Sequence, residues 1–156
     1  MHVNINDIAQ VCNLLDTKEK ANHADKNGWT FLIHTSMLGY LEASRHLIEL
    51  GADVNYVCPL QWTALLLACG NRHYDVIRLL IDNGADVNAR CNNGMTPIVL
   101  LMVGNSSNEE ERYKTLEYLI EKGASTEDAR RWHGQNAEFT RYIQEAPEGT
   151  VFSRSE

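Results

Sequence analysis

The chain has 156 residues and a net charge of −7 at pH 7, with 14 basic and 21 acidic side chains. Hydrophobic residues make up 44% of it, which is ordinary for a folded protein and argues against a disordered chain. The acidic balance, without a basic face, argues against a nucleic-acid partner. No apolar run approaches the roughly 20 residues of a membrane-spanning helix, so we expect no membrane partner.

A sequence repeat of 33 residues runs through the chain. The pentapeptide GADVN at residues 51–55 returns unchanged at residues 84–88, and Trp29 returns as Trp62. Self-similarity at a fixed period indicates a structural unit that stacks on copies of itself. Such proteins usually act through an extended surface.

The first predicted element is a helix over residues 7–15, whose apolar side chains share one face: Ile8, Val11, Leu14 and Leu15. Too little chain precedes this helix to complete a unit. Residues 1–24 are therefore interpreted as an N-terminal half-repeat or cap.

The first complete unit is predicted over residues 25–57. It opens with the turn signal DKNG, and Thr30 suits the N-cap of a helix over residues 31–37. A glycine then breaks the chain before an amphipathic helix over residues 40–50. Gly51 fits the left-handed residue that ends a helix.

The second unit, residues 58–90, repeats this order, with predicted helices over residues 63–69 and 74–83. Its turn has Gln61 where the turns of the other units have glycine. We therefore expect the hairpin of the second unit to differ in shape.

The third unit, residues 91–125, has Pro97 at the first helical position, where a missing N–H costs nothing. The offset from the threonine cap to the closing glycine is 27 residues, against 21 in the two earlier units. Six extra residues therefore fall between the two helices, around residues 104–108. We expect a mobile polar loop there, whose removal hardly changes stability because loop-closure entropy rises slowly with length.

Residues 126–145 are predicted to form a shortened C-terminal cap. A helix starts at Thr126, Gly134 interrupts it, and a second helix carries Phe139, Tyr142 and Ile143. Residues 146–156 are predicted to be a flexible tail. The whole of residues 1–145 is thus expected to form one domain.

These units resemble the ankyrin repeat, a 33-residue unit of a β-turn and two antiparallel helices with the signature T-P-L-H-x-A. The matching stretches are Thr30-Phe31-Leu32, Thr63-Ala64-Leu65-Leu66-Leu67-Ala68, Thr96-Pro97-Ile98 and the two GADVN strings. The resemblance covers roughly residues 7 to 145. It implies an all-α ankyrin-repeat solenoid of β-turn/helix-turn-helix units with capping repeats.

The chain departs from the family signature at its histidine. Ile33, Leu66 and Val99 replace it in the three units, so buried aliphatic side chains are expected to take over its role. His73 occupies the place where the family has a structural histidine after the first helix.

Cysteine usage and the amino terminus bear on the cellular compartment. Cys58 and Cys91 are equivalents in neighbouring units, and stacked equivalents lie roughly 8–10 Å apart. A disulfide needs Cα atoms within about 7 Å, so we expect reduced thiols. Residues 1–22 lack the features of a secretory signal. These features favour a cytoplasmic or nuclear protein.

Catalytic and metal sites are not expected. The six histidines fall at unrelated repeat positions, and no nucleophile, phosphate-loop or zinc-protease motif occurs. The cysteines lack the close spacing of zinc ligands, and Cys69 is expected to be a buried small hydrophobe. We predict no enzymatic activity, no cofactor and no metal.

The resemblance implies a binding surface, because the turn residues and the end of the first helix face the partner in the ankyrin family. The corresponding residues are Lys26, Asn27, Trp29, Met37 and Leu38 in the first unit, Pro59, Leu60, Trp62, Gly70 and Asn71 in the second, and Asn92, Asn93 and Met95 in the third. Exposed tryptophan is typical of binding hot spots. An alternative is that the tryptophans pack along the hairpins and hold neighbouring units together.

The resemblance also implies a modification. Ankyrin proteins can be substrates of an asparaginyl hydroxylase that prefers a leucine eight residues before an asparagine preceded by Asp-Val. Leu47 stands eight residues before Asn55, and Leu80 eight before Asn88. The alternative is that these asparagines only close the turn through hydrogen bonds to the backbone.

The predicted function is non-catalytic recognition of another protein by a monomer, through the hairpin tips and the concave inner-helix face. Two alternatives stay open. One is an adaptor or targeting domain of a larger regulatory or effector protein. The other is a protein inhibitor of an enzyme, whose acidic surface would favour a basic partner.

Overall fold

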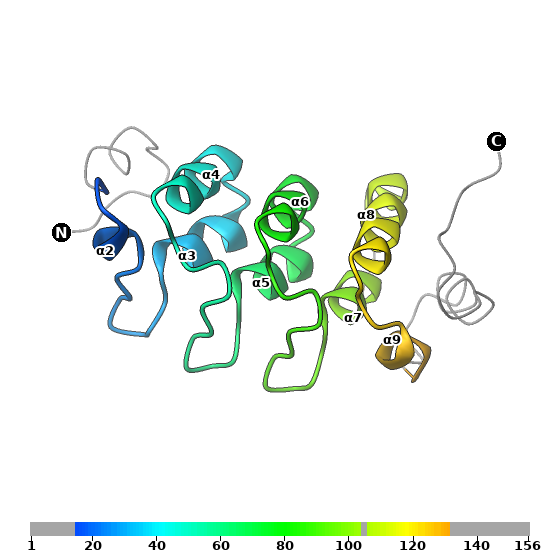
Figure 1. Cartoon of the computed structure of the whole chain (residues 1–156). Helices are drawn as coiled ribbons and strands as arrows, with labels where there is room; N and C mark the ends of the chain where they lie inside the picture. The colour runs from blue at the N-terminus through cyan, green and yellow to red at the C-terminus, as the bar shows by residue number, and fades with distance from the viewer. Residues whose placement is uncertain (1–14, 104–105, 132–156) are drawn as a thin grey trace.

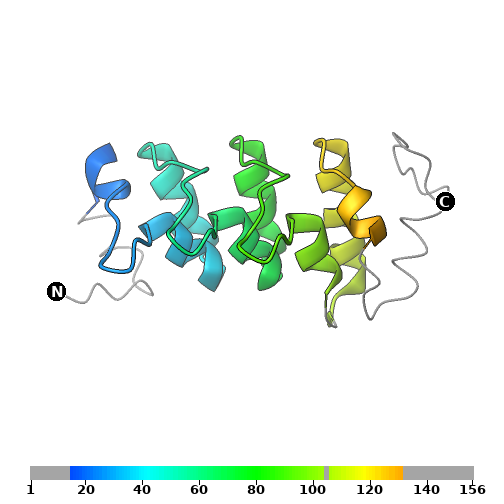
Figure 2. The ribbon, with the colours of Figure 1, turned by 90° about the horizontal axis from the view of Figure 1, so that it is seen from below.

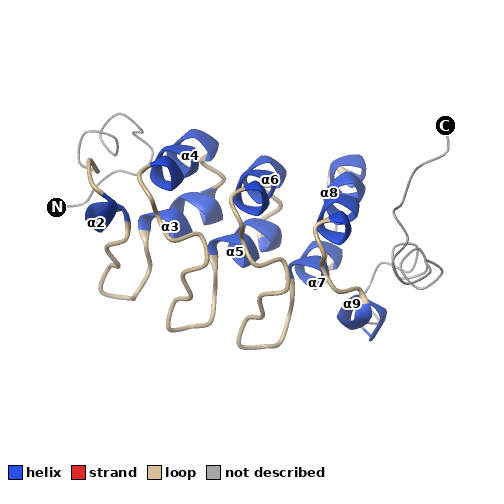
Figure 3. Ribbon diagram, in the orientation of Figure 1, coloured by secondary structure: helices blue, strands red, loops and turns tan. Residues whose placement is uncertain are grey.

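The computed structural model describes residues 15–103 and 106–131, whose helices stack side by side (Figure 1). In chain order the helices are α2 (Lys18–Ala21), α3 (Phe31–Leu38), α4 (Leu41–Glu49), α5 (Ala64–Gly70), α6 (Tyr74–Asp82), α7 (Pro97–Met102), α8 (Glu109–Glu121) and α9 (Glu127–Arg131). The described residues contain no strand beyond an isolated bridge between Ala24 and Thr30 (Figure 3). The prediction of an all-α repeat solenoid is confirmed.

The solenoid has two sides. The first helices of the three units, α3, α5 and α7, form one row, and the second helices, α4, α6 and α8, form another (Figure 1). The loops at residues 24–30, 57–63 and 90–96 project from the first row and follow one another when seen from below (Figure 2). We call these loops together with α3, α5 and α7 the hairpin side, and α4, α6 and α8 the outer side.

Threonine caps start the first helices, as predicted. Thr30 Oγ1 accepts a hydrogen bond from the N–H of Ile33 at 3.4 Å, and Thr63 Oγ1 accepts one from Leu66 at 3.3 Å. Thr96 makes no such bond, and α7 instead starts with Pro97, whose ring presets the helical backbone. The four helices of the first two units begin and end within one residue of their predicted bounds.

Gly39 and His73 join the first two units. Gly39 adopts a left-handed φ of 77°, and a Cβ added there would lie 2.4 Å from His73 Nδ1. His73 Nε2 lies 2.9 Å from the carbonyl oxygen of Met37. The predicted structural role of His73 is therefore confirmed, and the left-handed conformation predicted for Gly51 is present with a φ of 91°.

The prediction that the turn of the second hairpin differs in shape is wrong. Gln61 adopts a left-handed φ of 63° and closes its turn by donating from its N–H to Cys58 O at 2.8 Å. Gly28 closes the first turn in the same way, donating to Asp25 O at 2.9 Å. A left-handed non-glycine residue costs roughly 1–2 kcal/mol. Gln61 is exposed, and its turn closes with the same backbone hydrogen bond as the turn of Gly28.

The described residues at the insertion contact the second unit, which was not expected, while the mobility of the loop and the small effect of its removal stay predictions. Arg72 donates a hydrogen bond to the carbonyl oxygen of Val103, and Tyr74 Oη lies 2.9 Å from Ser106 Oγ. Asn108 caps α8 by accepting from the N–H of Glu111 at 3.1 Å. Residues 104–105 lie outside the described residues.

The ends of the described chain pack on the central units. The short helix α2 was not predicted; it begins because Thr17 Oγ1 accepts from the N–H of Lys20 at 3.3 Å, and it buries Ala21. At the other end, a helix predicted from Thr126 is present as α9, which packs against α7 and buries Ala129. The helix predicted over residues 7–15 lies outside the described residues except for Leu15, which is buried but not helical. The second cap helix with Phe139, Tyr142 and Ile143 and the tail over residues 146–156 also lie outside them.

One continuous apolar core runs through the units. Ile33, Leu66 and Val99, which replace the signature histidine, are all buried. Cys58, Cys69 and Cys91 are buried free thiols, and burial raises the pKa of the Cys69 thiol. Cys12 lies outside the described residues. Within the described ranges, no helix has the length and apolar character needed to cross a membrane.

Candidate functional site

The three hairpins present equivalent residues in equivalent positions. In each, the residue before the threonine cap accepts a backbone hydrogen bond across the loop. Trp29 O accepts from Asp25 at 2.9 Å, and Trp62 O accepts from Cys58 at 3.0 Å. Met95 O accepts from Cys91 at 3.1 Å. Backbone hydrogen bonds thus close the loops. The side chains at the loop tips are not needed for this closure and can differ between units.

The first hairpin is organised around a carboxylate. Asp25 accepts hydrogen bonds from the N–H groups of Asn27 at 2.8 Å and Trp29 at 3.0 Å, and its second oxygen lies 2.9 Å from His34 Nε2. The bond from the Trp29 backbone, followed by the His34 ring, holds the pKa of Asp25 below its ordinary value. The Trp29 ring also lies against His34, with 5.2 Å between ring centroids.

Neighbouring hairpins touch one another. Pro59 occupies the space beside Gly28, where an added Cβ would lie 2.5 Å from Pro59 Cδ. Tyr56 Oη donates to Gly28 O at 3.1 Å. These contacts hold the first and second hairpins as a continuous surface.

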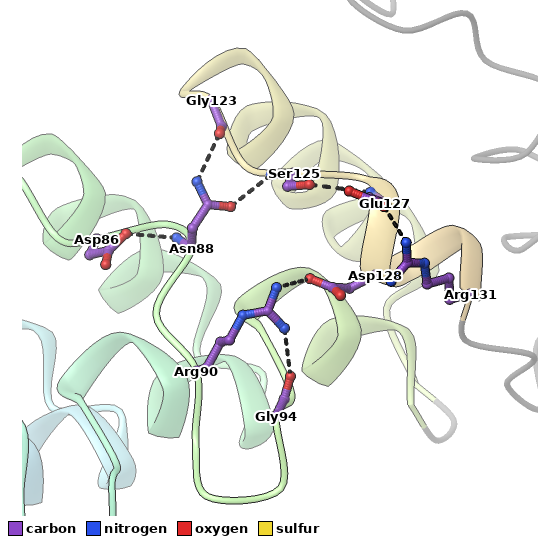
Figure 4. A network of polar contacts seen from close by, with 9 residues as sticks. All are labelled: Asp86, Asn88, Arg90, Gly94, Gly123, Ser125, Glu127, Asp128 and Arg131. Atoms are coloured by element: carbon purple, nitrogen blue, oxygen red, sulfur yellow. Dashed lines mark hydrogen bonds and ion pairs between the residues drawn. The ribbon is translucent and has the colours of Figure 1, made fainter.

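The third hairpin is tied to α9 (Figure 4). Arg90 donates to Gly94 O at 3.2 Å and forms an ion pair with Asp128 at 2.5 Å. Arg131 pairs with Glu127 within α9. The last described helix therefore supports the third hairpin from the side.

The predicted contact residues divide into two groups by exposure. The exposed ones are Lys26, Asn27, Leu38, Pro59, Leu60, Gly70, Asn71, Asn92 and Asn93. The half-buried ones are Trp29, Met37, Trp62 and Met95. Both tryptophans pack against the core, so each is shared between the core and the surface of the hairpins. Asn71 also donates its side-chain amide to Leu67 O at 2.8 Å, which helps to end α5.

Exposed apolar residues concentrate on the second hairpin. The large hydrophobic side chains exposed in the described part of the chain are Leu60 at 56%, Val57 at 49% and Leu38 at 43%. Leu60 and Val57 both belong to the second hairpin. Sequence analysis missed Val57, whose equivalents in the neighbouring units are Ala24 and Arg90.

Acidic, lysine and arginine side chains are absent from the helices of the hairpin side. The segments FLIHTSML, ALLLACG and PIVLLM of α3, α5 and α7 contain no Asp, Glu, Lys or Arg. The outer side is densely charged, with ion pairs such as Arg78–Glu111 at 2.8 Å and Lys114–Glu110 at 2.8 Å. The acidic net charge therefore does not describe the hairpin side.

The predicted hydroxylation sites are part of a ladder between units. Asn55 donates to Gly84 O at 2.9 Å and accepts from the N–H of Asp86 at 2.7 Å. Asn88 repeats this pattern, donating to Gly123 O at 3.0 Å and accepting from Ser125 N at 2.8 Å (Figure 4).

A third rung of this ladder escaped the sequence analysis. Asn22 donates to Gly51 O at 3.0 Å and accepts from Asp53 N at 2.7 Å. The sequence indicates this third position only by its spacing, because Asn22 lies 33 residues before Asn55 but is not part of a GADVN string. The asparagines thus hydrogen-bond to the backbone, and each bonds to the following unit. Hydroxylation of Asn55 and Asn88 stays a prediction.

The chain matches a family model described as ankyrin repeats in three copies, over residues 1–91 and 51–130. No curated protein matches the chain. Among the described residues, no group of three or more His, Cys, Asp or Glu side chains is placed to hold a metal ion. Ankyrin repeats are generally protein–protein interaction modules and generally non-catalytic. The stacked units, their left-handed glycines and this match together show that the chain belongs to the ankyrin-repeat family.

Proposed function

We propose that this protein binds a partner protein through its hairpin side, without catalysis, and that the second hairpin is the centre of the contact. The observation that carries the proposal is the exposure of Leu60 and Val57 on that hairpin, beside first helices that hold no Asp, Glu, Lys or Arg. Apolar side chains gathered on a projecting loop are typical of interaction sites.

The energetics favour apolar recognition. Full burial of one leucine side chain is worth roughly 1.5–3 kcal/mol. The neighbouring hairpins present exposed amides at Asn27, Asn92 and Asn93, which suit the polar rim that surrounds the apolar centre of an interface. Since the centre carries no charge, we expect the affinity to depend little on salt.

The proposed contact set combines the residues predicted from the sequence with one residue found in the structure. Its members are Lys26, Asn27, Trp29, Met37, Leu38, Val57, Leu60, Trp62, Asn71, Asn92, Asn93 and Met95. We propose that the protein acts as a monomer in the cytoplasm or nucleus, where the buried thiols stay reduced.

Asn55 and Asn88 are retained as proposed hydroxylation sites, because both residues are exposed. The control is Asn22, which makes the equivalent hydrogen bonds but is half-buried and lacks the preceding Asp-Val. Peptide mass spectrometry of the protein from its own cells should show one added oxygen on Asn55 or Asn88 and none on Asn22. Unmodified peptides throughout would refute this part of the proposal.

Site-specific photocrosslinking tests the binding proposal. A photoreactive residue replaces Leu60 on the hairpin side or Arg45 on the outer side, both exposed, and each protein is irradiated in a lysate of the source organism. We expect a discrete protein adduct from position 60 and none from position 45. An adduct from position 45 alone, or no adduct from either position, would contradict the proposal.

A further inference from the structure

The core of the first unit differs in chemistry from the core of the second, and at three positions also from that of the third. Three of its fully buried residues are hydroxylic: Thr35, Ser36 and Ser44. Their structural equivalents are Ala68, Cys69 and Ile77 in the second unit, and Leu101, Met102 and Leu116 in the third. All six of these equivalents are buried and apolar, so the helix pair α3–α4 encloses polar groups where α5–α6 and α7–α8 enclose apolar ones.

The hydroxyl groups of the first unit are incompletely satisfied. Ser44 donates to Thr35 Oγ1 at 2.9 Å, and Thr35 donates to Leu32 O at 3.3 Å. Ser36 Oγ is buried and has no hydrogen-bond partner in the described part of the chain. A buried hydroxyl loses its bonds to water, and without a replacement this loss opposes folding.

We infer that the first unit, α3 with α4, opens and closes locally while the second unit, α5 with α6, stays folded. In a solenoid each unit contacts only its neighbours. The stability of the whole protein is therefore approximately the sum of the stabilities of the units and of the interfaces between them. A unit with a weaker core then opens at a lower free energy than its neighbours. The hydroxylic core identifies the first unit as weaker than the second, whose equivalent residues are apolar.

Such opening would divide the binding surface into a fixed part and an adjustable part. Lys26, Asn27, Trp29, Met37 and Leu38 belong to the first unit, whereas the apolar second hairpin belongs to a stable one. A partner that contacts both parts would close the first unit on binding. This consequence rests on the proposed function, but the local opening itself does not.

Position in the chain offers a competing explanation, because units near a terminus open more readily whatever their core. Two reciprocal substitutions separate the explanations. Ser36→Cys gives the first unit the residue of the second, and Cys69→Ser does the reverse. Serine and cysteine are close in size and in helix propensity, so each swap changes mainly the polarity of one buried group.

Hydrogen exchange with mass spectrometry on the full chain, without any partner, tests the inference. Amides over residues 31–49 should be protected at least about tenfold less than those over residues 64–82. Ser36→Cys should raise the protection of the first segment, and Cys69→Ser should lower that of the second, each by about threefold or more. Equal protection in the unmodified chain would overturn the inference. So would a difference that neither substitution changes, because it would then come from chain position. Both results are independent of whether the hairpins bind a protein.

Discussion

The hairpin side and the outer side are built from the same repeat and differ in chemistry. The first helices α3, α5 and α7 carry no Asp, Glu, Lys or Arg, and the second hairpin exposes Leu60 at 56%. The outer helices carry charges that pair within and between units, as Arg78 does with Glu111 at 2.8 Å.

Net charge averages over the two sides and therefore does not describe the chemistry of either one. Exposed ion pairs contribute only about 0–1 kcal/mol to stability, so the charges of the outer side serve mainly solubility. A basic partner, as in the alternative of an acidic enzyme inhibitor, would meet no acidic residue on α3, α5 or α7. An apolar partner would bind the hairpin side, where exposed leucine and half-buried tryptophan lie together.

The largest expected effect is the loss of stability when a buried side chain of the hairpin side is truncated, compared with an exposed one. Leu65→Ala in α5 removes a side chain that is 1% exposed and should lower the free energy of unfolding by about 2–5 kcal/mol. Leu60→Ala on the hairpin should change it by about 0.5 kcal/mol or less. Urea unfolding followed by circular dichroism measures both. Similar losses for the two would mean that the second hairpin is docked core and not a free surface.

An intermediate effect is expected where the units join. Asn55→Ala removes both the bond to Gly84 O and the acceptor for the N–H of Asp86. Because the side chain is exposed and water replaces part of the loss, we expect destabilisation by about 1–2 kcal/mol. Asn83→Ala, which loses only a bond to Leu79 O within its own unit, is the matched control. If thermal unfolding shows a larger loss of stability for Asn83→Ala than for Asn55→Ala, the asparagine ladder does not stabilise the contact between units.

The smallest effect is expected on the outer side, and it depends on pH. The hydrogen bond and charge of Arg78 lower the pKa of Glu111 below its ordinary value of 4.5. A lowered pKa means that the ion pair stabilises the fold above about pH 4.5 and that this contribution is lost as the pH falls through the folded-state value. Glu111→Gln should therefore melt slightly below the unmodified protein at neutral pH. The two melting temperatures should converge as the pH falls below the ordinary glutamate pKa of 4.5 and Glu111 becomes protonated in the folded protein. A difference that stays constant with pH would exclude the ion pair as its cause.

The sequence predicted the elements of the fold because local signals specify them. Thr30, Thr63 and the left-handed Gly39 and Gly51 each act within a few residues, and the 33-residue period repeats the signals in phase. The period also located the hairpins and therefore the candidate surface.

What the sequence did not reveal depends on contacts between units. The contacts at the insertion need Arg72 and Tyr74, which lie about one repeat away from their partners Val103 and Ser106. Asn22 lacks the motif that marked its two equivalents. The exposure of Val57 also emerged only once the hairpin was placed, since its side chain is apolar like those of the core.

The most direct test of the central claim is the affinity of the crosslinked partner, once purified, for three forms of the protein. These are the unmodified chain, Leu60→Ser and Arg45→Ser, compared at about 0.05 M and 0.5 M NaCl. The apolar hairpin side predicts that Leu60→Ser raises Kd about 30-fold, equivalent to about 2 kcal/mol. Arg45→Ser should change Kd by about twofold or less, and the tenfold change in salt by about threefold or less. If Arg45→Ser or added salt weakens binding more than Leu60→Ser does, recognition takes place on the charged outer side and the account is wrong.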